Sequence, residues 1–221
     1  GTFVLCWVRS CLRGHEHPAL DAAIWAANTL RIPVLVLLHL QDGYPTATAR
    51  RQMFLLEGAR FALGELQRRG LRTHVQVDRK CGRPPAHLLL SEQAALTVAE
   101  EPFCVPWLES AEDLCTQTQG PLWFVDCCSV VPSVLVPPSA CHRAYVFEQA
   151  TRQLHAEHLA RAWQDAEVSE VAGAALPPSL TEGLAPSVDL NVANLVELVQ
   201  AAEVDMAVPP VQHTVGGSEA G

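Results

Sequence analysis

Basic residues, and lysine above all, are scarce in this chain of 221 residues. Lys80 is the only lysine, and the other fourteen basic residues are arginines. Against them stand 24 acidic residues, which leave a formal net charge of −9. Because gripping nucleic-acid phosphates requires clustered Lys and Arg, this balance argues against nucleic-acid binding by these residues alone.

Long hydrophobic runs are also absent. The longest uncharged apolar run, residues 32–40, is far shorter than the roughly 20 residues that cross a bilayer. No leader headed by Lys or Arg precedes it, as a secreted protein would need. We therefore expect a soluble, unexported, cytoplasmic protein with no membrane partner.

Compact cysteine motifs are missing, although the chain has eight cysteines. No CxxC occurs, and the spacing does not match a secreted disulfide framework. Cys6, Cys104 and Cys127 lie in apolar runs, where a free thiol behaves as a small hydrophobic group. We expect reduced, mostly structural cysteines in an intracellular protein.

Signatures of metal and nucleotide sites are missing as well. His15 and His17 flank Glu16, and His155 and His158 form a helical pair, but neither pair has a third ligand at a known spacing. The chain has no GxxxxGK[ST], no GxGxxG after its first apolar run and no GxSxG. The residues predict no metal site and no catalytic residue.

The apolar pattern alternates between short, strand-like runs and longer, helix-like ones. Strands are expected at residues 3–8, 34–40, 71–77, 95–99 and 122–126, and helices between them at 18–30, 47–69, 85–93 and 109–118. This order predicts an α/β fold with a doubly wound, five-stranded parallel sheet of the Rossmann type. Trp7 and Trp123, within continuous apolar runs, are expected in the core.

The last third of the chain has a different character. Residues 130–138 contain three prolines and cannot form a regular central strand, whereas 141–163 predict a helix. Residues 169–187 are rich in Ala, Pro and Gly, a short helix is expected at 191–202, and the ending looks cut. We predict an α/β domain over 1–165 and an interdomain linker with helical parts over 166–221.

The loop after the first strand, residues 9–18, contains two Arg, a thiol and two His. In a doubly wound sheet, ligands bind at the carboxyl ends of the strands, near the switch in strand order. Two interpretations remain open at this point. Arg9 and Arg13 bind an anionic or polar ligand, or they tie the loop to neighbouring parts of the protein.

The same stretch resembles a known family. Residues 7–20, WVRSCLRGHEHPAL, are similar to the pattern W-x-R-R-D-L-R-x-x-D-N-P-A-L that opens the photolyase/cryptochrome family. The matching positions are Trp7, Arg9, Leu12, Arg13, Pro18, Ala19 and Leu20. Ser10 and Cys11 depart from the pattern, which has Arg and an acidic residue there. Residues 125–132 resemble V-D-A-H-N-I-V-P of class II DNA photolyases, and 204–211 resemble that class's bridge to its second domain.

This resemblance implies the N-terminal α/β domain of a photolyase-like flavoprotein. The full-length protein would then repair cyclobutane pyrimidine dimers in DNA under light, with FAD and the lesion held by a helical C-terminal domain that would follow residue 221. The α/β domain would carry an antenna pigment, which could be a folate, a deazaflavin or a flavin. We expect residues 1–221 alone to be a monomer that holds no FAD and repairs no DNA. The alternative is a degenerate, non-catalytic ligand-binding or interaction module.

The pigment site is expected where the loops after the first, second and fourth strands converge. The residues predicted there are Arg9, Ser10, Cys11, His39, Leu40 and Trp107. Trp107 could stack on a planar ring, and Arg9 could pair with an acidic tail. Alternatively, Arg9 pairs with a carboxylate of its own domain and Trp107 covers the sheet edge.

Overall fold

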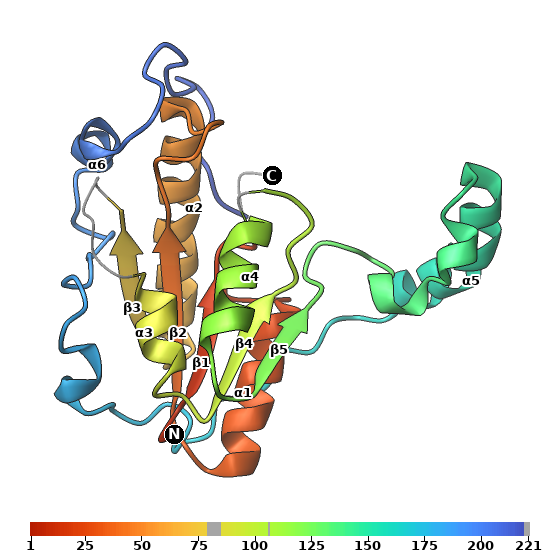
Figure 1. The fold of residues 1–221 in the computed structure, drawn as a ribbon, viewed down its shortest axis with the longest axis horizontal. Coiled ribbons are helices and arrows are strands. Elements are labelled where there is room, and N and C mark those ends of the chain that lie inside the picture. The colour runs from red at the N-terminus through yellow and green to blue at the C-terminus, as the bar shows by residue number, and fades with distance from the viewer. Residues whose placement is uncertain (79–84, 106, 219–221) are drawn as a thin grey trace.

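A computed structural model describes residues 1–78, 85–105 and 107–218, so that Lys80, Cys81 and Pro106 lie outside the described residues. Its centre is a parallel sheet with the strand order β3-β2-β1-β4-β5 (Figure 1). The strands are β1 (Val4–Val8), β2 (Val34–Leu40), β3 (Arg72–Val77), β4 (Leu96–Glu100) and β5 (Leu122–Val125). The predicted five-stranded parallel α/β fold is confirmed. The strand order reverses between β1 and β4, where such folds place their ligands.

Helices cover both faces of the sheet. The helices that follow the first four strands are α1 (Pro18–Leu30), α2 (Ala49–Arg68), α3 (Ala86–Ser91) and α4 (Trp107–Gln117). Alternate residues of β1 enter two different hydrophobic clusters, since successive side chains of a strand point to opposite faces. Val4, Cys6 and Val8 pack with α1 and α2, whereas Leu5 and Trp7 pack with α3 and α4.

The ends of the two long helices follow from local chemistry. His17 is the N-cap of α1, where its ring accepts a hydrogen bond from the Leu20 amide, and Pro18 occupies the first turn. Thr48 caps α2 in the same way, through the Arg51 amide. Gly70 ends α2 with a φ of 78°, a left-handed conformation that a side chain would disfavour. These caps hold the amino ends of α1 and α2 at the carboxyl edge of the sheet.

Much of the segment 166–208 packs against the sheet and α2. The Ala172 carbonyl accepts a hydrogen bond from the Val34 amide, and the Val188 amide donates to the Val75 carbonyl, both at 2.9 Å. Leu190 and Leu198, the latter from α6 (Leu195–Ala201), are buried in the cluster that contains α1 and α2. Whether this segment leads to a further domain stays a prediction.

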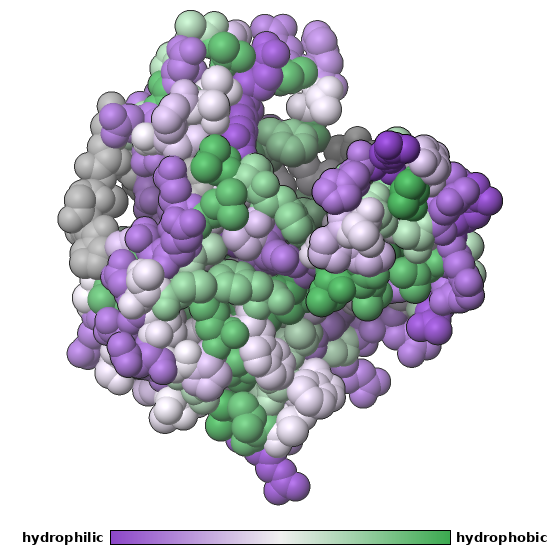
Figure 2. Space-filling model, turned by 45° about the vertical axis from the view of Figure 1, so that its right-hand side comes forward, coloured by the Kyte–Doolittle hydropathy of each residue, from purple (hydrophilic) through white to green (hydrophobic). Residues whose placement is uncertain are grey.

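A helical arm extends from the body beyond β5. It consists of the short 3-10 helices η1 (Ser133–Leu135) and η2 (Pro138–Ala140) and of α5 (Ala144–Ala160), and it projects to the right in Figure 1. All residues of α5 are described, and Thr151 is the one buried residue among them. In the space-filling view, apolar side chains gather where the arm meets the body (Figure 2). No helix in the described part of the chain has the length and apolar character needed to cross a membrane.

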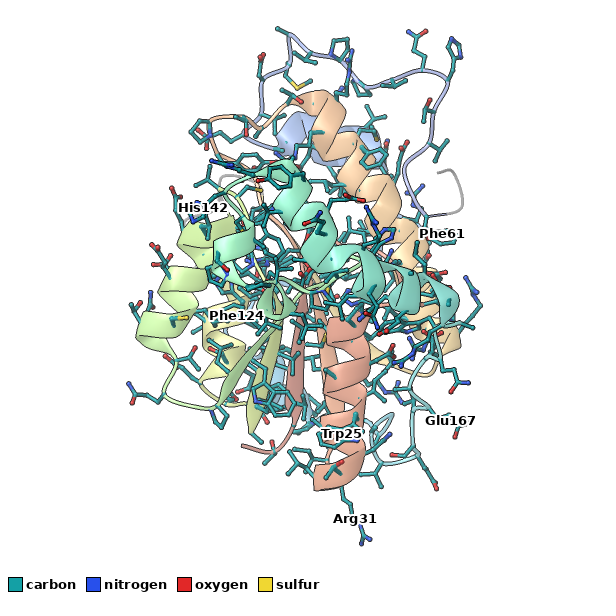
Figure 3. The ribbon with its side chains drawn as sticks, turned by 90° about the vertical axis from the view of Figure 1, so that its right-hand side faces the viewer. Trp25, Arg31, Phe61, Phe124, His142 and Glu167 are labelled. Atoms are coloured by element: carbon teal, nitrogen blue, oxygen red, sulfur yellow. The ribbon has the colours of Figure 1, made fainter. Side chains whose placement is uncertain are left out.

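Two expectations about burial were wrong. Trp123 is 41% exposed, because β5 is an edge strand that pairs only with β4 and leaves that side chain partly uncovered. Cys104 is exposed, because it lies in the loop after β4 rather than in a strand. Trp25, about whose burial the sequence makes no prediction, is 60% exposed on the outer side of α1 (Figure 3). By contrast, the expected burial of Trp7 is confirmed, with an exposed fraction of 0%.

The contrast between the two strand tryptophans gives a matched test. Trp7→Ala should lower the free energy of unfolding by about 3–5 kcal/mol, because it opens a cavity in the core. Trp123→Ala should lower it by less than about 1 kcal/mol, because that side chain keeps much of its contact with water. Urea denaturation followed by circular dichroism measures both values. Equal losses for the two variants would contradict the placement of β5 at the sheet edge.

Candidate functional site

A buried carboxylate, Glu100, lies at the end of β4, beside the switch in strand order. Its side chain is 1% exposed and accepts hydrogen bonds from the loop after β1. The Ser10 amide donates at 2.7 Å and the Ser10 hydroxyl at 2.6 Å. The amides of Arg9 and Cys11 donate at 3.2 and 3.0 Å. Glu100 therefore fixes the backbone of three successive loop residues.

The surroundings of Glu100 keep it ionised. Burial by itself would raise its pKa, but contact with His17 and hydrogen bonds from Ser10 outweigh burial and lower the pKa to about 2. The fully buried His17 ring faces it, with Nε2 at 3.4 Å from Oε1. Because His17 Nδ1 accepts from the Leu20 amide, the ring proton is assigned to Nε2, on the side of the carboxylate. Glu100 thus joins the β1 loop to the start of α1.

Arg9 lies deep in the same junction and is 2% exposed. Its guanidinium donates to the backbone carbonyls of Glu100 and of Trp107, the latter at 3.1 Å. It also lies over the Trp7 ring, 4.3 Å from the ring centre. Of the two interpretations left open by the sequence, the structure shows the one in which Arg9 ties the loop to its neighbours. The partners are carbonyl oxygens rather than a carboxylate, and a pigment contact of Arg9 stays a prediction.

A group of buried rings lies on the α3 side of the sheet. Trp7 and His87 are stacked, with centroids 3.9 Å apart and planes within 6°. His39 Nε2 lies 3.0 Å from a carboxylate oxygen of Asp78. Neither ring nitrogen of His87 has a partner among the described residues. Burial, followed by the nearby charges of His39 and Arg9, lowers the pKa of His87 to about 3, so the ring is neutral at pH 7.

The outer part of the carboxyl edge is more open. The rings of Tyr44 and Trp107 have centroids 6.1 Å apart, and the Arg51 guanidinium lies 5.2 Å from the Tyr44 ring and 5.7 Å from that of Trp107. The Tyr44 hydroxyl and both amide atoms of Gln52 are buried without a partner among the described residues. Buried polar groups usually have one, so these atoms suggest a ligand or water that would satisfy them.

A pocket of about 290 Å³ adjoins Tyr44. Its charged and polar lining residues are Gln41, Asp42, Tyr44, Asp78, Glu109, Ser110 and Asp113. Four of these are carboxylates, which repel a phosphate or another anionic group. The pocket is therefore unsuited to an anionic group and compatible with an uncharged or cationic group that donates hydrogen bonds. Among the described residues, no group of His, Cys, Asp and Glu could hold a metal ion.

The six residues predicted for the site fall into two groups. Arg9, Ser10, Cys11 and Trp107 come together around Glu100 and the loop after β4. His39 and Leu40, each 1% exposed, lie beneath the surface. Whether any of the six contacts a pigment stays a prediction.

Sequence reasoning missed Tyr44, Arg51 and Gln52 at this edge. A signal for Gln52 was present, because it occupies a position in line with the apolar stripe of the helix predicted over 47–69. A polar side chain in such a stripe is expected to be buried, and burial is costly unless the side chain has a hydrogen-bond partner.

Comparisons with known proteins show that the chain is similar to photolyases. No protein-family model matches the sequence. Over 133 residues, the chain is 32% identical to the deoxyribodipyrimidine photo-lyase of Methanothermobacter thermautotrophicus. The match covers 60% of this chain and 29% of that protein, so the chain spans less than a third of its curated relative.

The solved structure of one photolyase supports the fold. An archaeal photolyase from Sulfolobus tokodaii, solved with two FAD molecules, matches 91% of this chain and 42% of its own with a TM-score of 0.51. At 15% identity this likeness concerns the fold alone. A universal stress protein from Archaeoglobus fulgidus matches 57% of this chain and 99% of its own, at 16% identity and a TM-score of only 0.39.

The lowered pKa of His87 predicts a specific pH dependence of stability. Below pH 6.5 the unfolded chain binds a proton at this ring, whereas the folded protein does so only near pH 3. The free energy of unfolding should therefore fall as the pH drops from 6.5, by up to about 1.4 kcal/mol per pH unit from this residue. His87→Phe should remove that part of the slope between pH 6.5 and 5, while His158→Phe, on the exposed face of α5, should not. Identical slopes for the wild type and His87→Phe would contradict the burial of a neutral ring.

Proposed function

We propose that the chain is the N-terminal α/β domain of a photolyase-like protein and serves as the antenna and scaffold domain of a light-dependent DNA-repair flavoprotein. The substrate proposed for the whole protein is the cyclobutane pyrimidine dimer. The similarity in sequence to a deoxyribodipyrimidine photo-lyase supports this proposal. Because the chain spans 29% of that relative, FAD and damaged DNA are assigned to polypeptide beyond these residues. Their binding would take place in a helical domain that docks on this one, in a cytoplasmic monomer.

The observation that carries the antenna role is the group of unsatisfied polar atoms at the carboxyl edge. Gln52 is 1% exposed, and its amide can both donate to and accept from a heterocyclic ring. Trp107, the first residue of α4, and Tyr44, in the loop after β2, provide aromatic faces at the same edge. We assign Arg9, Ser10 and Cys11, which are hydrogen-bonded to Glu100 at this edge, to the wall of the proposed site. The buried His39 and Leu40 are assigned to the same wall. When bound, the pigment would supply light absorption, and the protein would supply its placement.

The size and charge of the pocket restrict which part of a pigment it could hold. A volume of about 290 Å³ is at the lower end for small-molecule sites, enough for a ring system but not for a dinucleotide. Asp42, Asp78, Glu109 and Asp113 oppose a phosphate at the same place. Among a folate, a deazaflavin and a flavin, the site favours the uncharged ring portion of each. The Sulfolobus tokodaii photolyase, whose two FAD molecules implicate a novel light-harvesting cofactor, gives a precedent for a second pigment in a protein of this fold.

A second candidate function is a non-catalytic module that keeps the photolyase fold. It is favoured by Arg9, whose terminal guanidinium nitrogens are bonded to the protein's own carbonyls. The two functions differ in what the full-length protein absorbs and does. Flavin absorbance, with light-dependent loss of pyrimidine dimers from ultraviolet-treated DNA, supports the repair enzyme. A full-length protein without flavin bands and without photorepair supports the module.

Riboflavin and FMN provide a direct test of the antenna site. Residues 1–221 should quench riboflavin fluorescence saturably, and FMN should bind at least about tenfold more weakly, because its phosphate meets the acidic lining. Gln52→Leu should weaken riboflavin binding by about tenfold or more while leaving the protein as stable or more so, because it replaces unpartnered polar atoms. Trp25→Ala, on the exposed side of α1, should change neither.

Two results would overturn the antenna assignment. One is the absence of saturable binding for riboflavin and for a reduced folate alike. The other is unchanged riboflavin affinity in Gln52→Leu. Neither result affects photorepair by the full-length protein, so the antenna and repair parts of the proposal fail separately.

A further inference from the structure

Three cysteine thiols meet at the carboxyl edge from two loops that are distant in sequence. Cys11 follows β1, and the adjacent Cys127 and Cys128 follow β5. The Cys11 thiol donates to the Cys127 backbone carbonyl at 3.2 Å, across a separation of 116 residues. Interaction with the Cys127 thiol raises the pKa of Cys11, and interaction with the Cys11 thiol contributes to the raised pKa of Cys128, so the three sulfurs lie close together. Contact between two thiols is the geometric precondition for a disulfide.

The three thiols differ in access. Cys127 is 7% exposed, and its thiol donates to the Val125 carbonyl at 3.4 Å. Its sulfur also lies 3.8 Å from His17 Nδ1. Cys11 is half-buried, so a small reagent can reach it, and Cys128 is exposed. Cys11 is thus the member of the group that combines access with contact to the buried thiol.

We propose that Cys11 and Cys127 form a reversible oxidation site, which a small-molecule disulfide converts into an intramolecular disulfide. The Cys11 thiolate attacks one sulfur of the oxidant RSSR, forming a Cys11–SR bond and releasing one RS⁻. The Cys127 thiolate then attacks the Cys11 sulfur, forms the protein disulfide and releases the second RS⁻. Two electrons pass from the two thiols to the oxidant, and the two protein protons are taken up by the two RS⁻ to give two RSH. This inference does not depend on the proposed function.

The surroundings set the conditions under which the site reacts. The hydrogen bond with Cys127, followed by burial and the charge of Glu100, raises the pKa of Cys11 above its usual value. The thiolate is the attacking species, and a raised pKa leaves little thiolate at neutral pH, so the reaction is slow there. Its rate should rise about tenfold for each pH unit above pH 7, because the thiolate fraction does so. The product joins the loop after β1, which Glu100 organises, to the loop that leads from β5 to α5. A cross-link over so long a separation restricts the unfolded chain strongly.

The experiment treats the whole chain with oxidised glutathione at pH 7, 8 and 9, and then maps disulfides by mass spectrometry of peptides. We expect the loss of two hydrogen atoms, a Cys11–Cys127 linkage, and a melting temperature raised by about 5 °C or more until dithiothreitol reverses it. Cys11→Ser and Cys127→Ala should each abolish the linkage and the shift. Cys128→Ser and Cys115→Ser, at exposed positions, should leave both unchanged.

Three outcomes would overturn the proposal. These are a linkage of Cys11 to Cys128, a glutathione adduct on Cys11 that persists without a protein disulfide, and the absence of any reaction at pH 9. In Cys128→Ser the buried Cys127 thiol is the one partner for Cys11 that remains in this loop. A disulfide in that variant therefore identifies Cys127 even if Cys127→Ala folds poorly.

Discussion

The buried carboxylate of Glu100 is the interaction on which the rest of this structure depends. A charged group at 1% exposure is costly unless hydrogen bonds replace its water, and here three backbone amides, a hydroxyl and the edge of His17 do so. Through these contacts one side chain at the end of β4 sets the path of the loop after β1 and the first turn of α1. The switch in strand order, where an open α/β sheet would leave a crevice, is thereby closed from within.

This closure divides the carboxyl edge into an inner and an outer part. In the inner part, Trp7 stacks on His87, Arg9 lies over Trp7, and the His39 ring is tilted against His87. All four side chains are buried and belong to the fold. In the outer part, Tyr44 and Gln52 have buried polar atoms without partners among the described residues, and Tyr44 lines an acidic pocket. The ligand chemistry of the domain is therefore expected from the loops after β2 and β4 rather than from Arg9.

The sequence predicts the parts of this arrangement that depend on neighbouring residues in the chain. It does not predict the parts that depend on which distant segment packs nearby. Continuous apolar runs such as 34–40 predicted buried strands, because a strand covered on both faces has no polar side. The same argument failed for Trp123, since burial at an edge strand depends on what covers it, and the run 122–126 does not contain that information. Residues 169–187 read as a loop from composition, yet the Ala172 carbonyl bonds to the Val34 amide beside β2. Composition does not reveal such backbone contacts.

At the site, too, the sequence predicts some features and not others. The position of Arg9, Ser10 and Cys11 at the carboxyl edge followed from the strand order. Their partner Glu100 could not be chosen over its neighbour Glu101 without knowing which side chain points inward. The thiol contact is a further case, because Cys11 and Cys127 stand where the resembled family pattern has an acidic residue and an alanine. Nothing in their separate contexts indicates that they touch.

The account is tested most directly by the ionisation of Glu100 itself. Carbon-13 NMR of the side-chain carboxyl, in protein labelled at glutamate and assigned with Glu100→Gln, follows its titration. We expect no change in the Glu100 signal between pH 7 and 4, and a midpoint near 2 or loss of the fold before it is reached. A midpoint at or above the ordinary value of 4.5 would contradict the role given to this carboxylate.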